Sequence, residues 1–376
     1  MNDGAPCSDT ALTFLPVYQP DLSGNERRYL LEAFDSTWIS SRGKFLDRFE
    51  AAFASVVGTP HVTAVCNGTV ALHLALHALG LRPGDEVIVP SFTYIASVNT
   101  IVQAGGVPVF AEVAADDWLL DPEVISARIT PRTRAVMPVH LYGAVCDMDR
   151  ISAMARDRGL AVVEDCAEAL GSSWRGRHVG SWSDVATFSF FGNKTVTTGE
   201  GGMVLARDAE ILRRLQIAKG QGMDPERRYW HVAMGFNYRM TNLAAAIGLG
   251  QIERLEDILA RKRAIAARYR DNLAGHPFTF QARKPEVTNS EWLISLLLPP
   301  RCDRDAVMRR LAAARIETRP VFYCAHHMPH HARPDVSLPV SEDIAARGIS
   351  LPSYPSLSMA EVDRVCEALV EAVRAS

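Results

Sequence analysis

The chain has 376 residues, which is enough for two domains of ordinary size and a large buried core. Hydrophobic residues make up 48% and charged residues 22%, which excludes a disordered or collagen-like chain. The formal net charge of −3 gives no basic excess for nucleic acid, and no apolar run reaches the about 18 residues of a membrane helix. We therefore expect a globular protein that binds neither nucleic acid nor a membrane.

The cysteines and the N-terminus indicate the compartment. Seven cysteines are scattered along the chain without a C-x-x-C pair, which favours reduced thiols. Residues 1–16 lack the basic and then apolar order of a secretory signal. Both features predict a cytoplasmic protein.

The first two thirds of the chain alternate between short apolar strands and helices. Two helices are predicted first, over 25–36 and 46–56. Strands are then predicted over 61–66, 86–90, 107–110, 135–140 and 160–165, with helices between them over 69–79, 94–104, 122–129 and 148–158. Continuous apolar strands separated by helices predict an α/β fold with a mostly parallel sheet covered on both faces. Residues 185–190 and 202–206 follow without a helix between them and are predicted as late strands of the same sheet.

The last third has a different pattern. One long helix is predicted over 241–274, with an arginine-rich polar face, as a link between two domains. A strand over 292–298, a helix over 303–314, a strand over 317–322 and a helix from Met359 follow it. We therefore predict a large α/β domain over residues 1–255 and a smaller α+β domain over residues 256–376.

A possible phosphate site follows the first strand of the alternation. Asn67, Gly68 and Thr69 stand where a helix begins. Glycine lets the backbone approach a ligand closely, and the free N–H groups at the start of a helix attract phosphate. An ordinary helix cap explains the same residues, and more readily when they are taken alone.

Two further strand ends carry charged residues. Asp165 closes an apolar strand, and a buried carboxylate there needs a cationic partner, which either a protonated pyridine nitrogen or a structural arginine would provide. Lys194 lies in TFSFFGNKTVTTGEGG, just after an aromatic run. Apolar surroundings lower the pKa of a lysine, and a neutral amine can form a Schiff base with an aldehyde. Lys194 taken alone could also be a surface residue, and Lys219 is a competitor that lacks the aromatic residues before it.

Five segments in this order resemble the DegT/DnrJ/EryC1/StrS family of pyridoxal-phosphate-dependent sugar aminotransferases. The segments are VCNGTVALHLAL, DEVIVPSFTYIAS, VVEDCAEALG, FSFFGNKTVTTGEGG and GFNYRMTNLAAAIG, and the resemblance extends from Tyr18 to Leu369. It implies the fold-type-I aminotransferase fold, pyridoxal 5′-phosphate as cofactor, and transfer of an amino group by a ping-pong reaction.

The resemblance also implies roles for individual residues. Lys194 matches the lysine that bonds to the cofactor aldehyde and then moves a proton, and Asp165 matches the acid that keeps the pyridine nitrogen protonated. Tyr94 matches the aromatic residue on the ring face, and the phosphate contacts match Gly68, Thr69 and Ser189. Asn237 matches an asparagine that reaches the cofactor phosphate of a neighbouring subunit, which implies a homodimer with shared active sites.

One position departs from the commonest family pattern. Glu168 stands where most members have Gln or His near the cofactor hydroxyl. A glutamate there would have to carry or share a proton to avoid repulsion. The perosamine-forming branch of the family accepts this residue, so we interpret it as a mark of that branch.

Other segments resemble the same branch, which transfers the amino group of L-glutamate to C4 of GDP-4-keto-6-deoxymannose. They are WISSRGKF, ERRYWH, ETRPVFY and ISLPSYPSL, and the contacts that they predict to a nucleotide-sugar substrate come from Ser41, Arg319 and Tyr323. The resemblance also implies substrate contacts from Arg239, in GFNYR, and from His326 and His327, in a loop that matches the family's Tyr-x-x-His-x-Met-Pro loop over the sugar nucleotide. The alternatives are a GDP-3-keto sugar, as in mycosamine formation, or a keto-cyclitol of antibiotic biosynthesis. A transcription regulator of the same fold is disfavoured, because the chain has no residues left for a DNA-binding domain.

A group of four histidines and the single His140 have open interpretations. Four histidines surround Met328 and Pro329, but no carboxylate or cysteine is evidently spaced to complete a metal site, so none is predicted. His140 is either a core histidine or a catalytic one.

Overall fold

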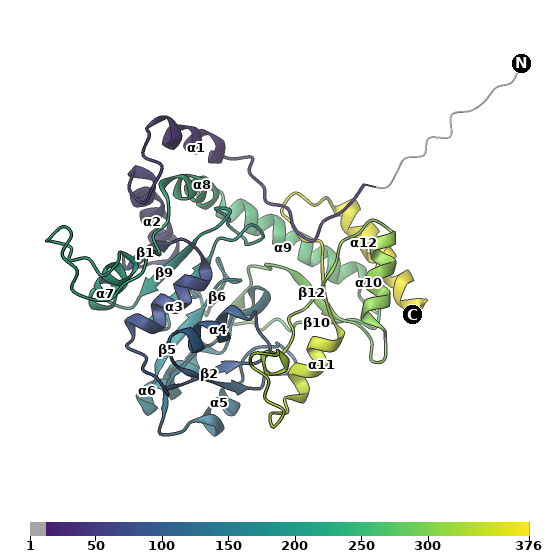
Figure 1. Ribbon diagram of the computed structural model, residues 1–376. Coiled ribbons are helices and arrows are strands. Elements are labelled where there is room, and N and C mark those ends of the chain that lie inside the picture. Colours follow the sequence, from purple (N-terminus) through teal and green to yellow (C-terminus); the bar gives the residue numbers. More distant parts are fainter. Residues whose placement is uncertain (1–12, 376) are drawn as a thin grey trace, which may run out of the picture.

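A seven-stranded sheet lies at the centre of the structure, a computed structural model that describes residues 13–375 (Figure 1). Its strand order is β1-β9-β8-β5-β4-β2-β3, and β9 is antiparallel to both of its neighbours while all other pairs are parallel. The strands are β1 (Val62–Val65), β2 (Glu86–Pro90), β3 (Val107–Ala111), β4 (Thr133–Val136), β5 (Ala161–Asp165), β8 (Val185–Ser189) and β9 (Gly202–Ala206). The predicted mostly parallel sheet is confirmed. Residues 1–16, in which we expect no secretory signal, lie mostly outside the described residues.

Helices cover both faces of this sheet. One face carries α3 (Gly68–Ala78), α4 (Ala96–Gln103) and α7 (Ala209–Lys219), and the other carries α2 (Lys44–Val57), α5 (Pro122–Arg128), α6 (Met148–Arg158) and α8 (Asn242–Ile252). In α2, Phe45, Phe49, Phe53 and Val57 recur every four residues and are all buried, because this spacing places them on one side of a helix. Burying each such side chain contributes about 1.5–3 kcal/mol. Helix α1 (Glu26–Asp35) packs on α8.

A second, antiparallel sheet belongs to the C-terminal part of the chain. Its order is β10-β12-β14-β13, from β10 (Thr279–Phe280), β12 (Ile294–Leu297), β13 (Arg319–Pro320) and β14 (Gly348–Leu351). It shares a core with α9 (Leu255–Asn272), α10 (Arg304–Ala313) and α12 (Met359–Arg374), and α11 (Pro339–Arg347) precedes β14. A short third sheet joins β11 (Val287–Thr288), β6 (Ser173–Trp174) and β7 (Arg177–His178).

Helix α9 connects the two larger sheets (Figure 1). Leu255 and Leu259 lie in the core of the seven-stranded sheet, and Ile265 and Tyr269 lie in the core of the four-stranded sheet. Leu15, near the beginning of the chain, pairs with Ile316 beside the second sheet. The domain boundary at residue 255 stays a prediction.

Two predicted elements are wrong in their extent. The long helix over 241–274 is two helices, α8 and α9, separated at Glu253 and Arg254. Tyr29 Oη donates to Glu253 Oε1 at 2.7 Å and Arg254 donates to Asp21 at 2.9 Å, so contacts with the N-terminal segment hold the break. Strand β4 ends at Val136 instead of residue 140, because Pro138 has no N–H to donate to a neighbouring strand.

Helices α7 and α11 and strand β14 are elements that the sequence analysis does not predict. Within residues 13–375, the structure has no helix that combines the length and the apolar character needed to cross a bilayer.

Candidate active site

A pocket of about 560 Å³ opens where several segments of the large sheet end. It is lined by the start of α3, the ends of β5 and β8 and the turn after β8, together with residues of the second sheet. Parallel strands of an open sheet bring their carboxyl ends to one edge, which is where such folds bind ligands. Of the predicted site residues, this pocket brings together Gly68, Thr69, Tyr94, Asp165, Glu168, Ser189, Lys194 and Arg319.

Lys194 lies in the turn after β8, with its side chain 12% exposed. Its Nζ is 3.5 Å from Glu168 Oε1 and 3.9 Å from the centre of the Trp292 ring system. Burial lowers the pKa of Lys194, and the nearby charges of Glu168 and Asp165 oppose that shift. The amine therefore loses its proton more readily than an exposed lysine does, as a nucleophile or a base requires.

Asp165, the last residue of β5, is 4% exposed. Its Oδ2 accepts a hydrogen bond from Ser97 Oγ at 2.8 Å and its Oδ1 accepts one from the Ala167 N–H at 3.1 Å. Burial raises the pKa of Asp165 and the Ser97 bond opposes the rise. Among residues 13–375, no arginine or lysine forms an ion pair with this carboxylate, so the structural-arginine interpretation is not supported. The carboxylate faces a pocket that a cationic ligand group would fit.

The start of α3 and the end of β8 form a narrow cradle. The Asn67 side chain caps the helix by accepting from the Val70 N–H at 2.9 Å, and the helix begins at Gly68. A Cβ on Gly68 would come within 2.7 Å of Ser189 Cβ, so only glycine allows this close approach. The free N–H groups of the first turn and the hydroxyls of Thr69 and Ser189 suit a phosphate group.

Glu168 is buried between the aromatic residues of the pocket and Lys194. Its Oε2 accepts from the Tyr142 N–H at 3.0 Å, and burial raises its pKa to about 7, which Lys194 opposes. The proton that the sequence analysis requires on or near Glu168 is therefore available at neutral pH.

An aromatic wall next to Lys194 escaped the sequence analysis. Trp292 stacks on Tyr142 at 6.1 Å and 14°, and Tyr142 stacks on Phe322 at 5.5 Å and 16°. Trp292 Nε1 also donates to the Asn193 carbonyl at 2.7 Å, next to Lys194. Tyr94 is 55% exposed and contacts Phe322 at 5.7 Å between ring centres. The resemblance predicts Tyr94, whereas Tyr142 and Trp292 lie far apart in the sequence and no local motif marks them.

Six predicted substrate or phosphate contacts lie outside the lining of this pocket in one subunit: Ser41, Asn237, Arg239, Tyr323, His326 and His327. Arg239 donates to Asn237 Oδ1 at 3.0 Å, and Arg304 donates to Tyr323 Oη at 3.3 Å. His326 is 1% exposed. Arg319 does line the pocket and donates to Glu317 Oε1 at 3.1 Å.

Two open alternatives are decided by position. Lys219 Nζ donates to Thr63 Oγ1 at 2.5 Å and to the Ala64 carbonyl at 2.9 Å, away from the pocket. His140 is fully buried, accepts from the Cys146 N–H at Nδ1 and lies 3.0 Å from Glu164 through Nε2. It does not line the pocket, which favours a core histidine.

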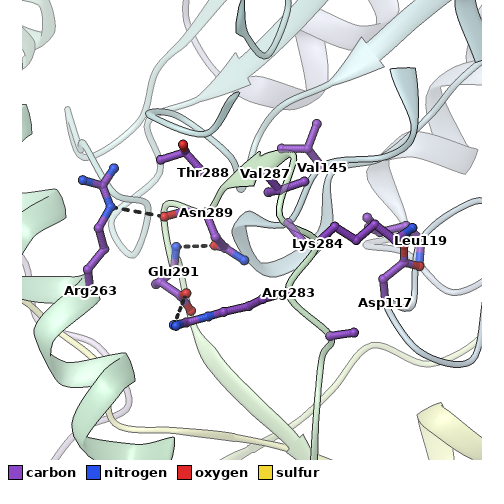
Figure 2. A pocket seen from close by; sticks show the side chains of 12 residues that line it. Asp117, Leu119, Val145, Arg263, Arg283, Lys284, Val287, Thr288, Asn289 and Glu291 are labelled. Carbon is purple, nitrogen blue, oxygen red and sulfur yellow. Dashed lines mark hydrogen bonds and ion pairs between the residues drawn. The ribbon is translucent and has the colours of Figure 1, made fainter. Parts of the chain in front are cut away.

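A second pocket, of about 310 Å³, holds more cations but leaves few of them available. Figure 2 shows Lys284 against Asp117, Arg283 bonded to Glu291 and Arg263 bonded to the Asn289 carbonyl. Two of its three cations are paired with buried carboxylates, and none of the predicted site residues lines it. The pocket around Lys194 is the candidate active site.

Comparisons with known proteins find aminotransferases of similar sequence and structure. A GDP-perosamine synthase of Escherichia coli O157:H7 is 48% identical over 96% of this chain and 99% of its own length. A Bacillus subtilis protein, named as the putative pyridoxal phosphate-dependent aminotransferase EpsN, is 34% identical over 93% of this chain and 94% of its own. The crystal structure of the aminotransferase TlmJ from Streptoalloteichus hindustanus matches with a TM-score of 0.91 at 31% identity, over 96% of this chain and 100% of that one.

The predicted fold class and the predicted resemblance to the perosamine-forming branch are thereby confirmed. The model of the DegT/DnrJ/EryC1/StrS aminotransferase family matches residues 20–370, which is nearly the whole chain. The chain belongs to this aminotransferase family.

Proposed function

We propose that this chain transfers the amino group of L-glutamate to GDP-4-keto-6-deoxymannose, with pyridoxal 5′-phosphate as cofactor. The likeness to GDP-perosamine synthase over nearly the full length of both chains supports the substrate. The observation that carries the proposal is one pocket that combines a buried amine, a buried carboxylate and a cradle at a helix start.

The residues of the pocket fit this cofactor. The cradle formed by Gly68, Thr69 and Ser189 would hold the phosphate, and Asp165 would accept a hydrogen bond from the protonated pyridine nitrogen. Tyr94 would cover one face of the ring. When bound, pyridoxal phosphate supplies an aldehyde that takes up amino groups and a ring that withdraws electrons from the neighbouring carbon.

Lys194 and Glu168 would handle the protons. Lys194 Nζ would accept the proton from the carbon that bears the transferred nitrogen, which its lowered pKa permits, and would give it back as an ammonium. Glu168, 3.5 Å away and with a pKa of about 7, donates a hydrogen bond in its protonated form or accepts one after ionisation. The aromatic wall of Trp292 and Tyr142 keeps water from this side of the amine.

The substrate phosphates need cations, and Arg319 is the one arginine among the pocket-lining residues. It extends from β13 of the second sheet and faces the pocket beside Ser350. We infer that Asn237 and Arg239, which lie outside the pocket of their own subunit, complete the site of a partner in a homodimer.

Substrate identity is tested by ligand stabilisation and turnover. We expect GDP to raise the melting temperature more than dTDP or UDP, and we expect glutamate-dependent amination of GDP-4-keto-6-deoxymannose at C4, identified by NMR of the product. Amination at C3 of the isomeric keto sugar would move the assignment to the mycosamine-type reaction. Turnover of scyllo-inosose without a preference for GDP would move it to the cyclitol alternative.

The assignment of Lys194 is tested separately. Borohydride reduction of the cofactor-loaded protein should fix the cofactor to Lys194, as seen by peptide mass mapping. Lys194→Ala and Lys194→Arg should both abolish this linkage and turnover, because neither residue offers a nucleophilic amine. A reducible adduct elsewhere in both variants would overturn the assignment.

A further inference from the structure

A group of possible metal ligands lies outside the candidate active site. His326 and His327, in the short helix η2 (Ala325–His327), face Glu342 of α11. His326 Nε2 is 3.1 Å from Glu342 Oε1, and His327 Nε2 is 3.8 Å from the same oxygen. One ligand atom from each residue lies within 4.8 Å of the others. Zinc ligands at about 2.0–2.2 Å from a common ion lie about 3–3.5 Å apart, so small side-chain movements would complete the site.

The surroundings of His326 and Glu342 hold two of these ligands in place. His326 is 1% exposed, and its other ring nitrogen, Nδ1, is 2.6 Å from Ser91 Oγ. If Ser91 Oγ accepts from Nδ1–H, the lone pair of Nε2 points at Glu342, an arrangement typical of metal-bound histidines. Glu342 Oε1 is fixed in turn by the Leu338 N–H at 3.0 Å.

We propose that His326, His327 and Glu342 bind a divalent transition-metal ion, with Zn²⁺ as the ion that this ligand set suits. Two imidazoles and one carboxylate favour zinc over magnesium or calcium. The His327 side chain is 60% exposed, so the remaining position would be open to water. The expectation of no metal site missed Glu342, because this residue comes from a helix that the sequence analysis did not predict.

A bound ion would link α11 to the segment that leads to Tyr94, next to the candidate active site. The Ala325 N–H donates to the Ser91 carbonyl at 2.8 Å and the His326 N–H donates to Ser91 Oγ at 3.2 Å, so η2 is attached to the segment that leads to Tyr94. A bound ion would tie α11 to this segment as well. It would also compete with any contact between His327 and substrate.

The test uses the full-length, cofactor-loaded protein with any affinity tag removed, treated with EDTA and then freed of it. Titration calorimetry with Zn²⁺ should show one site per chain, and Co²⁺ should give visible absorption typical of a bound ion. Glu342→Gln and His327→Asn should each weaken Zn²⁺ binding at least tenfold. His331→Asn is the matched control and should keep wild-type affinity, because His331 contacts Asn99 and not Glu342.

Each other outcome overturns the proposal. The site does not exist if the wild type binds no Zn²⁺, or if all four proteins bind it equally. Loss of Zn²⁺ binding in His331→Asn alone would place the ion at His331 instead of at Glu342. Melting curves in EDTA show whether Glu342→Gln still folds. If Glu342→Gln does not fold, His327→Asn tests the proposal, because this variant changes an exposed side chain.

Discussion

Lys194 is held on two sides by one residue, Trp292. The ring system lies 3.9 Å from Nζ, and the indole N–H bonds the carbonyl of Asn193, the residue before the lysine. Trp292 is 3% exposed and comes from the approach to β12, so the second sheet positions a reactive group of the first. We infer that Trp292 is a positioning residue for the amine.

Changing Trp292 should alter the pKa of Lys194 in a graded way. An aromatic face stabilises an ammonium by about 0.5–2 kcal/mol, so Trp292→Leu should lower the pKa of Lys194 by about 0.4–1.5 further. Trp292→Phe keeps an aromatic face and should fall between Leu and the wild type. The pH dependence of lysine modification in cofactor-free protein measures this, and identical profiles in all three proteins would contradict it.

Glu168 should make stability depend on pH. Its pKa rises from 4.5 to about 7 on folding, so the folded state binds a proton that the unfolded state has lost between these values. The contribution of Glu168 to the free energy of unfolding is fully present below about pH 4.5. It is lost as the pH rises to about 7, at roughly 1.4 kcal/mol per pH unit. Denaturant unfolding of cofactor-free wild type and Glu168→Gln should show a steeper loss of stability between pH 4.5 and 7 in the wild type than in the variant.

At the residue scale, the sequence analysis is most successful at strand ends. Asp165 and Ser189 each end a strand of the large sheet, and Gly68 and Lys194 follow one closely, so the topology alone brings them to one edge. Tyr142 and Trp292 depend on how a loop and the second sheet pack against that edge. No local pattern carries that information.

At the scale of elements, Gly250 allows α8 to pack closely on α1. A Cβ on Gly250 would come within 2.7 Å of the Glu26 nitrogen and 3.0 Å of its Cα. At an exposed position in a helix, Gly→Ala would stabilise the protein by about 0.5–1 kcal/mol. At Gly250 the backbone of α1 must move to make room for the new Cβ.

We therefore expect Gly250→Ala to destabilise the protein by about 1–3 kcal/mol, measured as the free energy of unfolding in urea. Gly58→Ala is a comparison from the end of α2, where a new Cβ meets nothing within 4 Å and only the positive φ of 76° opposes the change. Gly250→Ala as stable as the wild type would mean that the contact between α1 and α8 is not tight in solution.

The same region shows why one helix was predicted instead of two. The apolar spacing continues from α8 into α9, so periodicity alone cannot mark the break at Glu253 and Arg254. The break is held by side chains of Asp21, Asn25 and Tyr29, more than two hundred residues earlier in the chain. Local patterns predict the existence and type of elements, whereas tertiary contacts set such boundaries.

At the scale of the whole molecule, one segment of a single subunit exposes large apolar side chains to solvent. Between α7 and α8 the chain extends away from the large sheet (Figure 1) and exposes large side chains, with Tyr229 73%, Trp230 51% and Met234 85% exposed. Asn237 closes this segment through a backbone bridge to Gly220 and does not line the pocket of its own subunit. Exposed apolar groups next to a residue that the family resemblance assigns to a neighbouring subunit's site favour a partner subunit as the surface that covers them.

Mixed dimers test whether Asn237 serves the partner. In a dimer of one Lys194→Ala and one Asn237→Ala subunit, the pocket that keeps Lys194 receives an intact Asn237 from the other subunit. Equal mixing makes half of the dimers mixed, each with one intact site of two, so about a quarter of the wild-type activity should return. Mixing Lys194→Ala with Asp165→Ala is the matched control: both residues line one pocket, so no mixed dimer has an intact site and no activity should return. If Asn237 instead acts within its own subunit, the first mixture also gains nothing over its parents. Native mass spectrometry confirms that mixed dimers have formed, so a silent first mixture then assigns Asn237 to its own subunit.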